Sequence, residues 1–226
     1  MSYMWENFNI KPFPAETIVY RNGVFCPELS TIETEQLKKQ YYLPVHIIYV
    51  GEIDGEKHLD INMDIPNQKV YLSVNIKNKK PAFLKIFIKN TGENSELRGH
   101  ILLDNYDKLT YECAAKHQSK NTCILLQHKL IANKNSHSKL SGVAIIDKNC
   151  PDCNSDIDFS AIAAKDAKIE FLPAQRISSV PKRADHGASI YSPKPVQIEY
   201  LRGAGLSTTE INAVMREAFK NDFSLF

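Results

Sequence analysis

Apolar and polar residues alternate along the middle of the chain. In one run Val70, Leu72, Val74 and Ile76 alternate with Tyr71, Ser73 and Asn75, and in the next Leu84, Ile86 and Ile88 alternate with Lys85 and Phe87. A period of two places successive side chains on opposite faces of a β-sheet. The apolar runs "CILLQHKLIA", "SGVAII" and "AKIEFLP" follow, separated by the polar turns "KNTGENSE", "NKNSHSK" and "DKNCPDCNSD". Because no amphipathic helix lies between them, residues 44–180 are predicted to form an all-β body, either a sandwich, a barrel or a β-solenoid.

The N-terminal part, residues 1–43, shows a different pattern. The chain to about Pro14 has little periodicity and is expected to be a weakly anchored arm. Asn22-Gly23 lies between two apolar runs and predicts a hairpin turn, because this dipeptide favours positive φ angles. Ser30 and Glu33 have the spacing of a capping box, which predicts a short helix to about Gln40.

The C-terminal part, residues 181–226, is predicted to be helical. Ser192-Pro193 can begin a first helix, and Gly203 can end it in a left-handed conformation. Ser207 and Glu210 form a second capping box. The residues after it repeat with helical spacing and give one apolar stripe: Ile211, Val214, Met215, Ala218 and Phe219.

Charge and targeting signals narrow the range of partners. The 28 Lys and Arg residues against 26 Asp and Glu residues leave a net charge of +2, too small to attract a nucleic acid or an anionic membrane. The opening "MSYMWENFNIKPF" lacks the basic and apolar regions of a signal peptide, and no stretch approaches the ~20 apolar residues of a membrane span. Five irregularly spaced cysteines are typical of free thiols in a reducing compartment. These features predict a cytoplasmic protein with protein or small-ligand partners.

The sequence shows no catalytic motif. It lacks G-x-x-x-x-G-K-[ST] for phosphates, H-E-x-x-H for zinc and G-x-S-x-G for acyl transfer, so we do not expect an enzyme. The pair Cys150 and Cys153 forms a C-x-x-C motif that can bind a metal or form a redox disulfide, and the alternative is a polar turn that carries two thiols.

Two other functional classes remain open from the residues alone. The segment "YLRGAGLSTTEINAVM" has the layout of a helix-turn-helix DNA-binding motif, although its second helix carries little net positive charge. A carbohydrate-binding or structural β-solenoid would be expected to show rows of exposed aromatic residues, which the strands do not obviously supply.

The segment "AQRISSVPKRADHGASIYSPKPVQIEYLRGAGLSTTEINAVMREAF", residues 174–219, resembles the end of the SufB/SufD family of iron–sulfur cluster assembly proteins. The family has a strand ending in Pro-x-x-x-Ile, a His-Gly-Ala loop, a Tyr-Leu-x-x-Ala-Gly-Leu-Ser type turn and a short helix ending in Phe. Upstream, "NTCILLQHKLIANKNSHSKLSGVAIIDKNC" is similar to its central rungs, and "IVYRNGVFCPELS" to its entry segment.

The resemblance implies a right-handed β-helix with a small C-terminal helical cap. It also implies a non-catalytic scaffold or partner subunit in iron–sulfur cluster assembly, with no tightly bound cofactor and at most transient iron or a transient cluster. Typical members are longer, so we expect this chain to lack most of an N-terminal helical region and several rungs. The cysteine that SufB-type members carry six residues before the strand-ending proline falls here on Ala167, which makes the chain SufD-like.

The resemblance also implies site residues and partners. His186 corresponds to a histidine at the family's subunit interface, a candidate ligand for iron or a cluster, and Cys150 and Cys153 are further metal candidates. The alternative is that His186 only hydrogen-bonds a loop. The expected partners are a SufC-like ABC ATPase and either a SufB-like subunit or a second copy of this chain, paired through a sheet edge or end. The ATPase is expected on the C-terminal helices, at Tyr200, Leu201, Arg202, Glu210, Arg216 and Glu217, while part of the apolar stripe closes the end of the β-helix.

Overall fold

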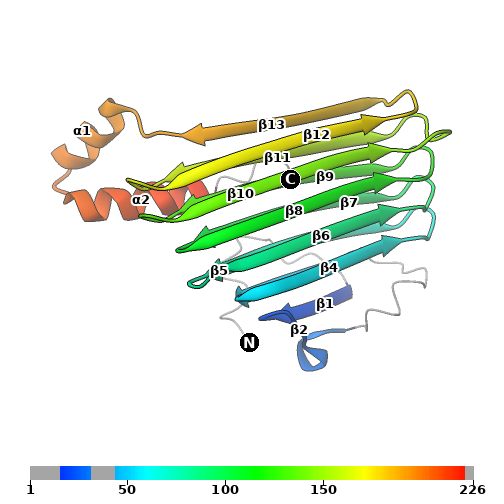
Figure 1. Ribbon diagram of the computed structural model, residues 1–226, viewed down its shortest axis with the longest axis horizontal. Helices are drawn as coiled ribbons and strands as arrows, with labels where there is room; N and C mark the ends of the chain where they lie inside the picture. Colours follow the sequence, from blue (N-terminus) through cyan, green and yellow to red (C-terminus); the bar gives the residue numbers. More distant parts are fainter. Residues whose placement is uncertain (1–15, 32–43, 222–226) are drawn as a thin grey trace.

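The computed structural model describes residues 16–31 and 44–221, which form two β-sheets and two C-terminal helices (Figure 1). Sheet A has the strand order β13-β11-β9-β7-β5-β3-β1-β2, and sheet B the order β12-β10-β8-β6-β4. The strands of sheet A are β1 (Glu16–Arg21), β2 (Val24–Phe25), β3 (Val45–Glu52), β5 (Lys69–Asn78), β7 (Glu96–Asn105), β9 (Cys123–Ala132), β11 (Asn154–Ala163) and β13 (Arg183–Tyr191). Those of sheet B are β4 (Gly55–Met63), β6 (Ala82–Asn90), β8 (Lys108–His117), β10 (His137–Ile146) and β12 (Lys168–Ile177).

From β3 onward the chain alternates between the two sheets, and each strand pairs in parallel with the strand two positions later. This arrangement is a parallel β-solenoid of about 6 turns. It confirms the all-β class and selects the solenoid over the sandwich and the barrel. The β-structure extends beyond the expected boundary at residue 180, because β13 adds a strand to sheet A before the helices begin.

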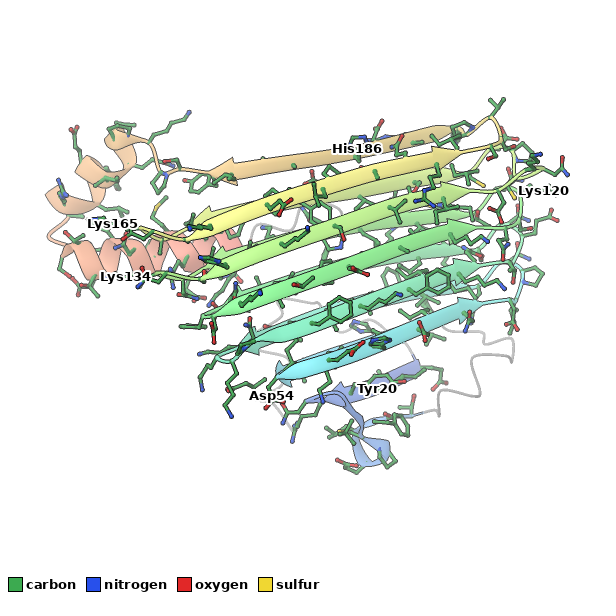
Figure 2. The ribbon with its side chains drawn as sticks, in the orientation of Figure 1. Tyr20, Asp54, Lys120, Lys134, Lys165 and His186 are labelled. Carbon is green, nitrogen blue, oxygen red and sulfur yellow. The ribbon has the colours of Figure 1, made fainter. Side chains whose placement is uncertain are left out.

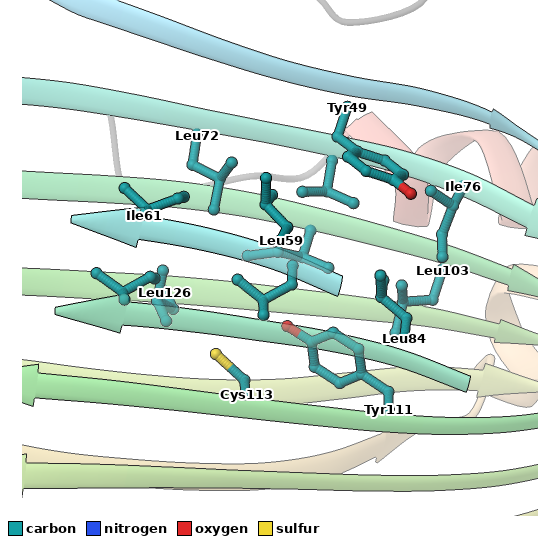
Figure 3. Packing of buried hydrophobic residues seen from close by; sticks show 14 of the residues in the cluster. Tyr49, Leu59, Ile61, Leu72, Ile76, Leu84, Leu103, Tyr111, Cys113 and Leu126 are labelled. Carbon is teal, nitrogen blue, oxygen red and sulfur yellow. The ribbon is translucent and has the colours of Figure 1, made fainter. Parts of the chain in front are cut away.

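The core lies between the two sheets and is built from the predicted alternation. Val70, Leu72, Val74 and Ile76 of β5 face Leu84, Ile86 and Ile88 of β6 across one buried cluster. Figure 3 shows part of this cluster, in which Leu72, Leu103 and Leu126 of sheet A lie close to Leu59, Leu84 and Tyr111 of sheet B. The residues between these positions point outward from the solenoid. One alternating pattern therefore produces both the lumen and the outer faces.

Residues with left-handed backbones stack at one corner of the solenoid. Asn67, Asn94, Asn121 and Asp152 all have φ angles near +60°, a conformation that Asn and Asp tolerate better than most residues. The N–H of Asn67 donates to the carbonyl of Glu93 in the next turn at 2.9 Å, and the other three corner residues repeat this bond. The first three are spaced 27 residues apart, and Asp152 follows after 31. The longer later turn is why the repeat looks irregular in the sequence.

The N-terminal hairpin forms as predicted. Asn22 and Gly23 have φ angles of 53° and 81° and join β1 to β2 in antiparallel pairing. A short 3₁₀ helix, Pro27–Leu29, follows. The expected arm to Pro14 and most of the expected helix after Ser30 lie outside the described residues.

The two helices are α1 (Pro195–Gly203) and α2 (Thr208–Asn221). Helix α1 begins at Pro195, later than the predicted Ser192-Pro193 start. The left-handed residue after it is Gly205, with φ +88°, so the assignment of that conformation to Gly203 was wrong. The capping box of α2 is confirmed: the N–H of Ser207 donates to the Glu210 carboxylate at 2.8 Å, and the N–H of Glu210 donates to the Ser207 hydroxyl at 3.3 Å.

The helices pack on the outer face of sheet A. Ile211 and Met215 of α2 are buried against Leu102, Ile131 and Ile162, which point away from the lumen. Within the predicted stripe, Phe219 is half-buried, while Val214 and Ala218 are exposed. The expectation that this stripe closes the end of the solenoid is therefore wrong, because side chains at the outer ends of β7, β9 and β11 already form an apolar patch that the stripe covers.

Candidate functional site

The solenoid ends with β12 and β13, and each strand leaves one edge unpaired among the described residues (Figure 1). The inward positions of β13 continue the rows of buried residues in β11: His186 aligns with Ile157, Ala188 with Phe159 and Ile190 with Ala161. The three positions in β11 are buried, whereas the three in β13 are exposed. This end of the solenoid is open and presents lumen-facing side chains beside two free strand edges.

His186 lies near the middle of β13, in a strand and not in the expected loop (Figure 2). Its register with Ile157 places its side chain on the lumen side of sheet A, where no further turn covers it. The next residue, Gly187, faces outward beneath the carboxylate of Asp158. An exposed imidazole on a free edge strand can bind a metal ion together with groups that a second protein supplies.

Cys150 and Cys153 lie in the corner that leads into β11, and both thiols are buried. The Sγ atom of Cys153 is 3.2 Å from the carbonyls of Ser119 and Cys150 and from the hydroxyl of Thr122, which lies 2.8 Å from Nδ1 of His117. Burial raises the pKa of Cys150 and favours its neutral thiol. In this arrangement the two free thiols fill the corner, and the Cys153 thiol contacts its carbonyl and hydroxyl groups.

The structure does not bring His186 and the two cysteines together. Since His186 pairs with Ile157, it lies four residues along the strand from Cys153, or about 13 Å at ~3.3 Å per residue. Within residues 16–31 and 44–221, no three His, Cys, Asp or Glu side chains form a group that could hold a metal ion. His186 therefore offers one ligand and not a complete site.

The candidate partner-binding residues of the helices divide into side chains that are exposed and free to bind and side chains that already contact other parts of this protein. Tyr200 is 76% exposed and Arg202 is exposed, while Leu201 packs into the contact with sheet A. Glu210 caps its own helix and Glu217 pairs with Lys220 at 2.7 Å. Arg216 donates to Oδ1 of Asn133 at 2.7 Å, so it faces the solenoid and not the expected outer surface.

Sequence reasoning missed two surface features. Val196 is exposed one helical turn before Tyr200, a spacing of four residues that could have indicated a shared face of α1. Asp156 and Asp158 share the outer face of β11, and Asp185 lies beside Asp156 on β13. The D-x-D spacing within a strand was the available signal for this acidic group.

The helix-turn-helix alternative is not favoured by the helices. The cationic side chains of α2 are Arg216 and Lys220, and both are engaged, by Asn133 and by Glu217. Its apolar face is buried on sheet A, and Ile211 and Met215 anchor it there. Among the described helices, none is long and apolar enough to cross a membrane.

Comparison with protein families gives one match. Residues 54–219 match the family model described as the SufBD core domain of the SUF system for FeS cluster assembly. No curated protein matches the chain in sequence. The matched range runs from the start of sheet B through the open end to the last turn of α2. Because it covers more than half of the chain, the protein belongs to the SufB/SufD family and has a role in iron–sulfur cluster assembly.

Proposed function

We propose that this protein is a non-catalytic, SufD-like subunit that pairs through its open end with a second SufBD-type subunit in the cytoplasm. The observation that carries the proposal is the last turn, where lumen-facing positions and two strand edges are uncovered together. Unpaired edges with exposed apolar side chains invite strand pairing with another chain. Among the large apolar residues of this end, Ile190 is 58% exposed and Ile177 is 42% exposed on the lumen side, and Leu172 is 43% exposed on the outer face.

His186 would supply one ligand to iron or to a nascent cluster held between the two subunits. The metal is the cargo of the assembly reaction, and the described residues contain no group of three His, Cys, Asp or Glu side chains that could hold it without a partner. A shared site of this kind forms only when the partner is present, and it releases its metal when the subunits separate. Cys150 and Cys153 remain candidates for metal binding only if the corner opens, because their thiols are buried.

The helices would dock an ABC-type ATPase. The exposed side of α1 carries Val196 and Tyr200 with Arg202 close by, a combination of apolar, aromatic and cationic groups that is enriched at protein interfaces. On α2, Glu210, Val214 and Glu217 are also exposed. Lys129 ties α2 to the solenoid, since its ammonium donates to the carbonyl of Phe219 at 2.6 Å. A force applied to the helices by the ATPase would thus reach sheet A directly.

Anaerobic reconstitution tests the proposal. The full chain is mixed with ferrous iron and sulfide, alone and with a SufB-type subunit, and bound iron is measured after gel filtration. We expect iron in the complex, a loss of at least half of it in His186→Ala, and no loss in His137→Ala, which removes an exposed histidine from β10. Iron-free complexes, or equal iron in wild type and His186→Ala, would overturn the ligand role.

A further inference from the structure

A row of outward-facing residues crosses sheet A and ends at its free edge. Gln127 of β9 pairs in register with Asp158 of β11, and Asp158 pairs with Gly187 of β13. Paired residues in parallel strands point to the same face, and neighbouring strands lie about 4.8 Å apart. The amide of Gln127, the carboxylate of Asp158 and the bare backbone of Gly187 are therefore neighbours on the outer face of the last turns.

This row contains hydrogen-bond acceptors that lack a donor. Oε1 of Gln127 is buried without a hydrogen-bond partner among the described residues, and the whole residue is only 9% exposed. The Asp158 side chain is half-buried and has neither an ion pair nor a hydrogen bond within residues 16–31 and 44–221. Burial raises the pKa of Asp158, as expected for a carboxylate that has lost water and gained no cation. Such groups are costly unless something pairs with them.

Gly187 lets this carboxylate reach the edge of the sheet. A Cβ atom at residue 187 would collide with Oδ1 of Asp158 and lie 3.5 Å from its Cγ, so the carboxylate leans from β11 toward Gly187. The nearby cation is already used, because Arg183 contacts Asp185 at 2.5 Å and Asp156 at 3.4 Å. Three carboxylates with one guanidinium leave this part of the edge with two negative charges, and Asp158 is the one without a partner.

We propose that Asp158 and Gln127 form a receptor for a lysine or arginine side chain carried by the edge strand of the partner subunit. The inference rests on the proposed function, in which this end is the subunit interface. A cationic side chain that extends over Gly187 would donate to the Asp158 carboxylate, and its head group would face Gln127, whose Oε1 lacks a donor among the described residues. Arginine is well suited to this role, because its guanidinium carries several donors in a fixed plane.

The same carboxylate selects against a second copy of this chain. In a symmetric pair of β13 strands centred on Gly187 the strand order would be β11-β13-β13-β11, so the two Asp158 residues would lie about three strand spacings, ~14 Å, apart, with both carboxylates leaning toward the shared edge on the same face of the joined sheet. The three carboxylates around one guanidinium give both edges of such a pair the same negative sign, and repulsion between like charges is a common way to disfavour a wrong partner. A partner with a basic edge is therefore favoured over a second copy of this chain.

Asp158→Asn tests both parts, because it removes the charge and keeps the shape. Binding of the full chain to a SufB-type subunit is measured by biolayer interferometry at 50 and 300 mM NaCl, and self-association of the chain alone by sedimentation velocity. We expect Asp158→Asn to weaken heterotypic binding at least tenfold at low salt and to self-associate at lower concentration than wild type. Gly187→Ala, which displaces the carboxylate, should weaken binding in the same direction. Asp60→Asn is the matched control, an exposed aspartate on β4 at the far end of the solenoid, and should change neither measurement.

The outcomes separate this inference from the proposed function. If wild type binds the SufB-type subunit and Asp158→Asn binds equally well, the receptor is overturned and the interface stands. If wild type does not bind that subunit, the proposed pairing fails. The inference about Asp158 is then tested by comparing the self-association of wild type and Asp158→Asn in sedimentation velocity. Self-association of Asp158→Asn equal to that of wild type would overturn it, and stronger self-association would support it. Thermal unfolding of every variant confirms that the chain is folded.

Discussion

The middle turns and the last turn of the solenoid are built from the same pattern but have different surroundings. In β9 the inward residues Ile124 and Leu126 are fully buried, because β7 and β11 flank them and sheet B covers them. In β13 the inward residues Ala188 and Ile190 are exposed, and so is His186, which occupies the position equivalent to Leu126. An alternating strand therefore gives core or interface according to whether another turn follows it.

The largest expected difference is in the cost of removing an inward side chain. Leu126→Ala deletes a fully buried side chain between two paired strands and should lower the free energy of unfolding by about 2–5 kcal/mol. Ile190→Ala at the open end should lower it by less than about 0.5 kcal/mol, because the side chain is 58% exposed. Urea denaturation of both variants measures this. Equal losses would show that the last turn is covered in the isolated chain.

Glycines at the two places should respond differently to an added methyl group. A Cβ at Gly99 in β7 would lie 2.6 Å from Cδ2 of Leu126 inside the core, so Gly99→Ala should cost about 1–3 kcal/mol of unfolding free energy through overpacking. Gly187→Ala meets only the side chain of Asp158 at the surface, which can rotate into solvent, and should cost less. Thermal denaturation of the two variants side by side checks the order, and a larger loss in Gly187→Ala would contradict it.

The pH dependence of stability should have opposite signs in the two regions. Burial lowers the pKa of His128 in the core to about 4, while the unfolded chain protonates near 6.5. As pH falls from about 6.5 to about 4 the unfolded state takes up the proton first, so stability is lost, by at most about 1.4 kcal/mol per pH unit for each such histidine. His46 and His117 have the same direction and size of shift. Burial raises the pKa of Asp158, so the folded state takes up this proton before the unfolded state does, and the free energy of unfolding increases on acidification.

Urea denaturation at pH 7.5, 6.0 and 5.0 measures this dependence. His128→Gln, which cannot titrate, should reduce the slope by the share of one histidine, although it loses the 3.0 Å contact with the Tyr111 hydroxyl and is less stable throughout. Asp158→Asn should leave the histidine slope intact and remove only the opposing contribution. A flat profile in wild type would contradict the neutral, buried state of these histidines.

Local features of the fold could be predicted from the sequence because neighbouring residues determine them. The run "CILLQHKLIA" coincides with β9, and the hairpin at Asn22 and the capping box at Ser207 appear where their residues predict them. The choice of a solenoid could not be derived from the alternation, since each strand from β3 onward pairs with one that lies 25 to 31 residues away. The equal spacing of Asn67, Asn94 and Asn121 was a usable signal, but only once their shared left-handed backbone was known.

The candidate site was predictable only in part. The family resemblance pointed to His186, whereas its place on an open edge strand depends on β13 being the last strand of sheet A. The separation of His186 from Cys150 and Cys153 follows from strand register. Arg216 was assigned to an outer surface because helical spacing cannot show which neighbours a helix meets, and Asn133, 83 residues away, contacts it.

By itself the sequence determined that the strands alternate, that the chain ends in two capped helices and that it resembles the SufB/SufD family, since these depend on residue spacing. Tertiary structure alone decided which alternating strands are covered on both sides, that α2 lies on sheet A and does not close the end, and that Asp158 stands over Gly187 without a cation. The physical reason is that side-chain periodicity assigns a residue to a face. Burial, charge pairing and free edges depend on which distant strand lies next to that face.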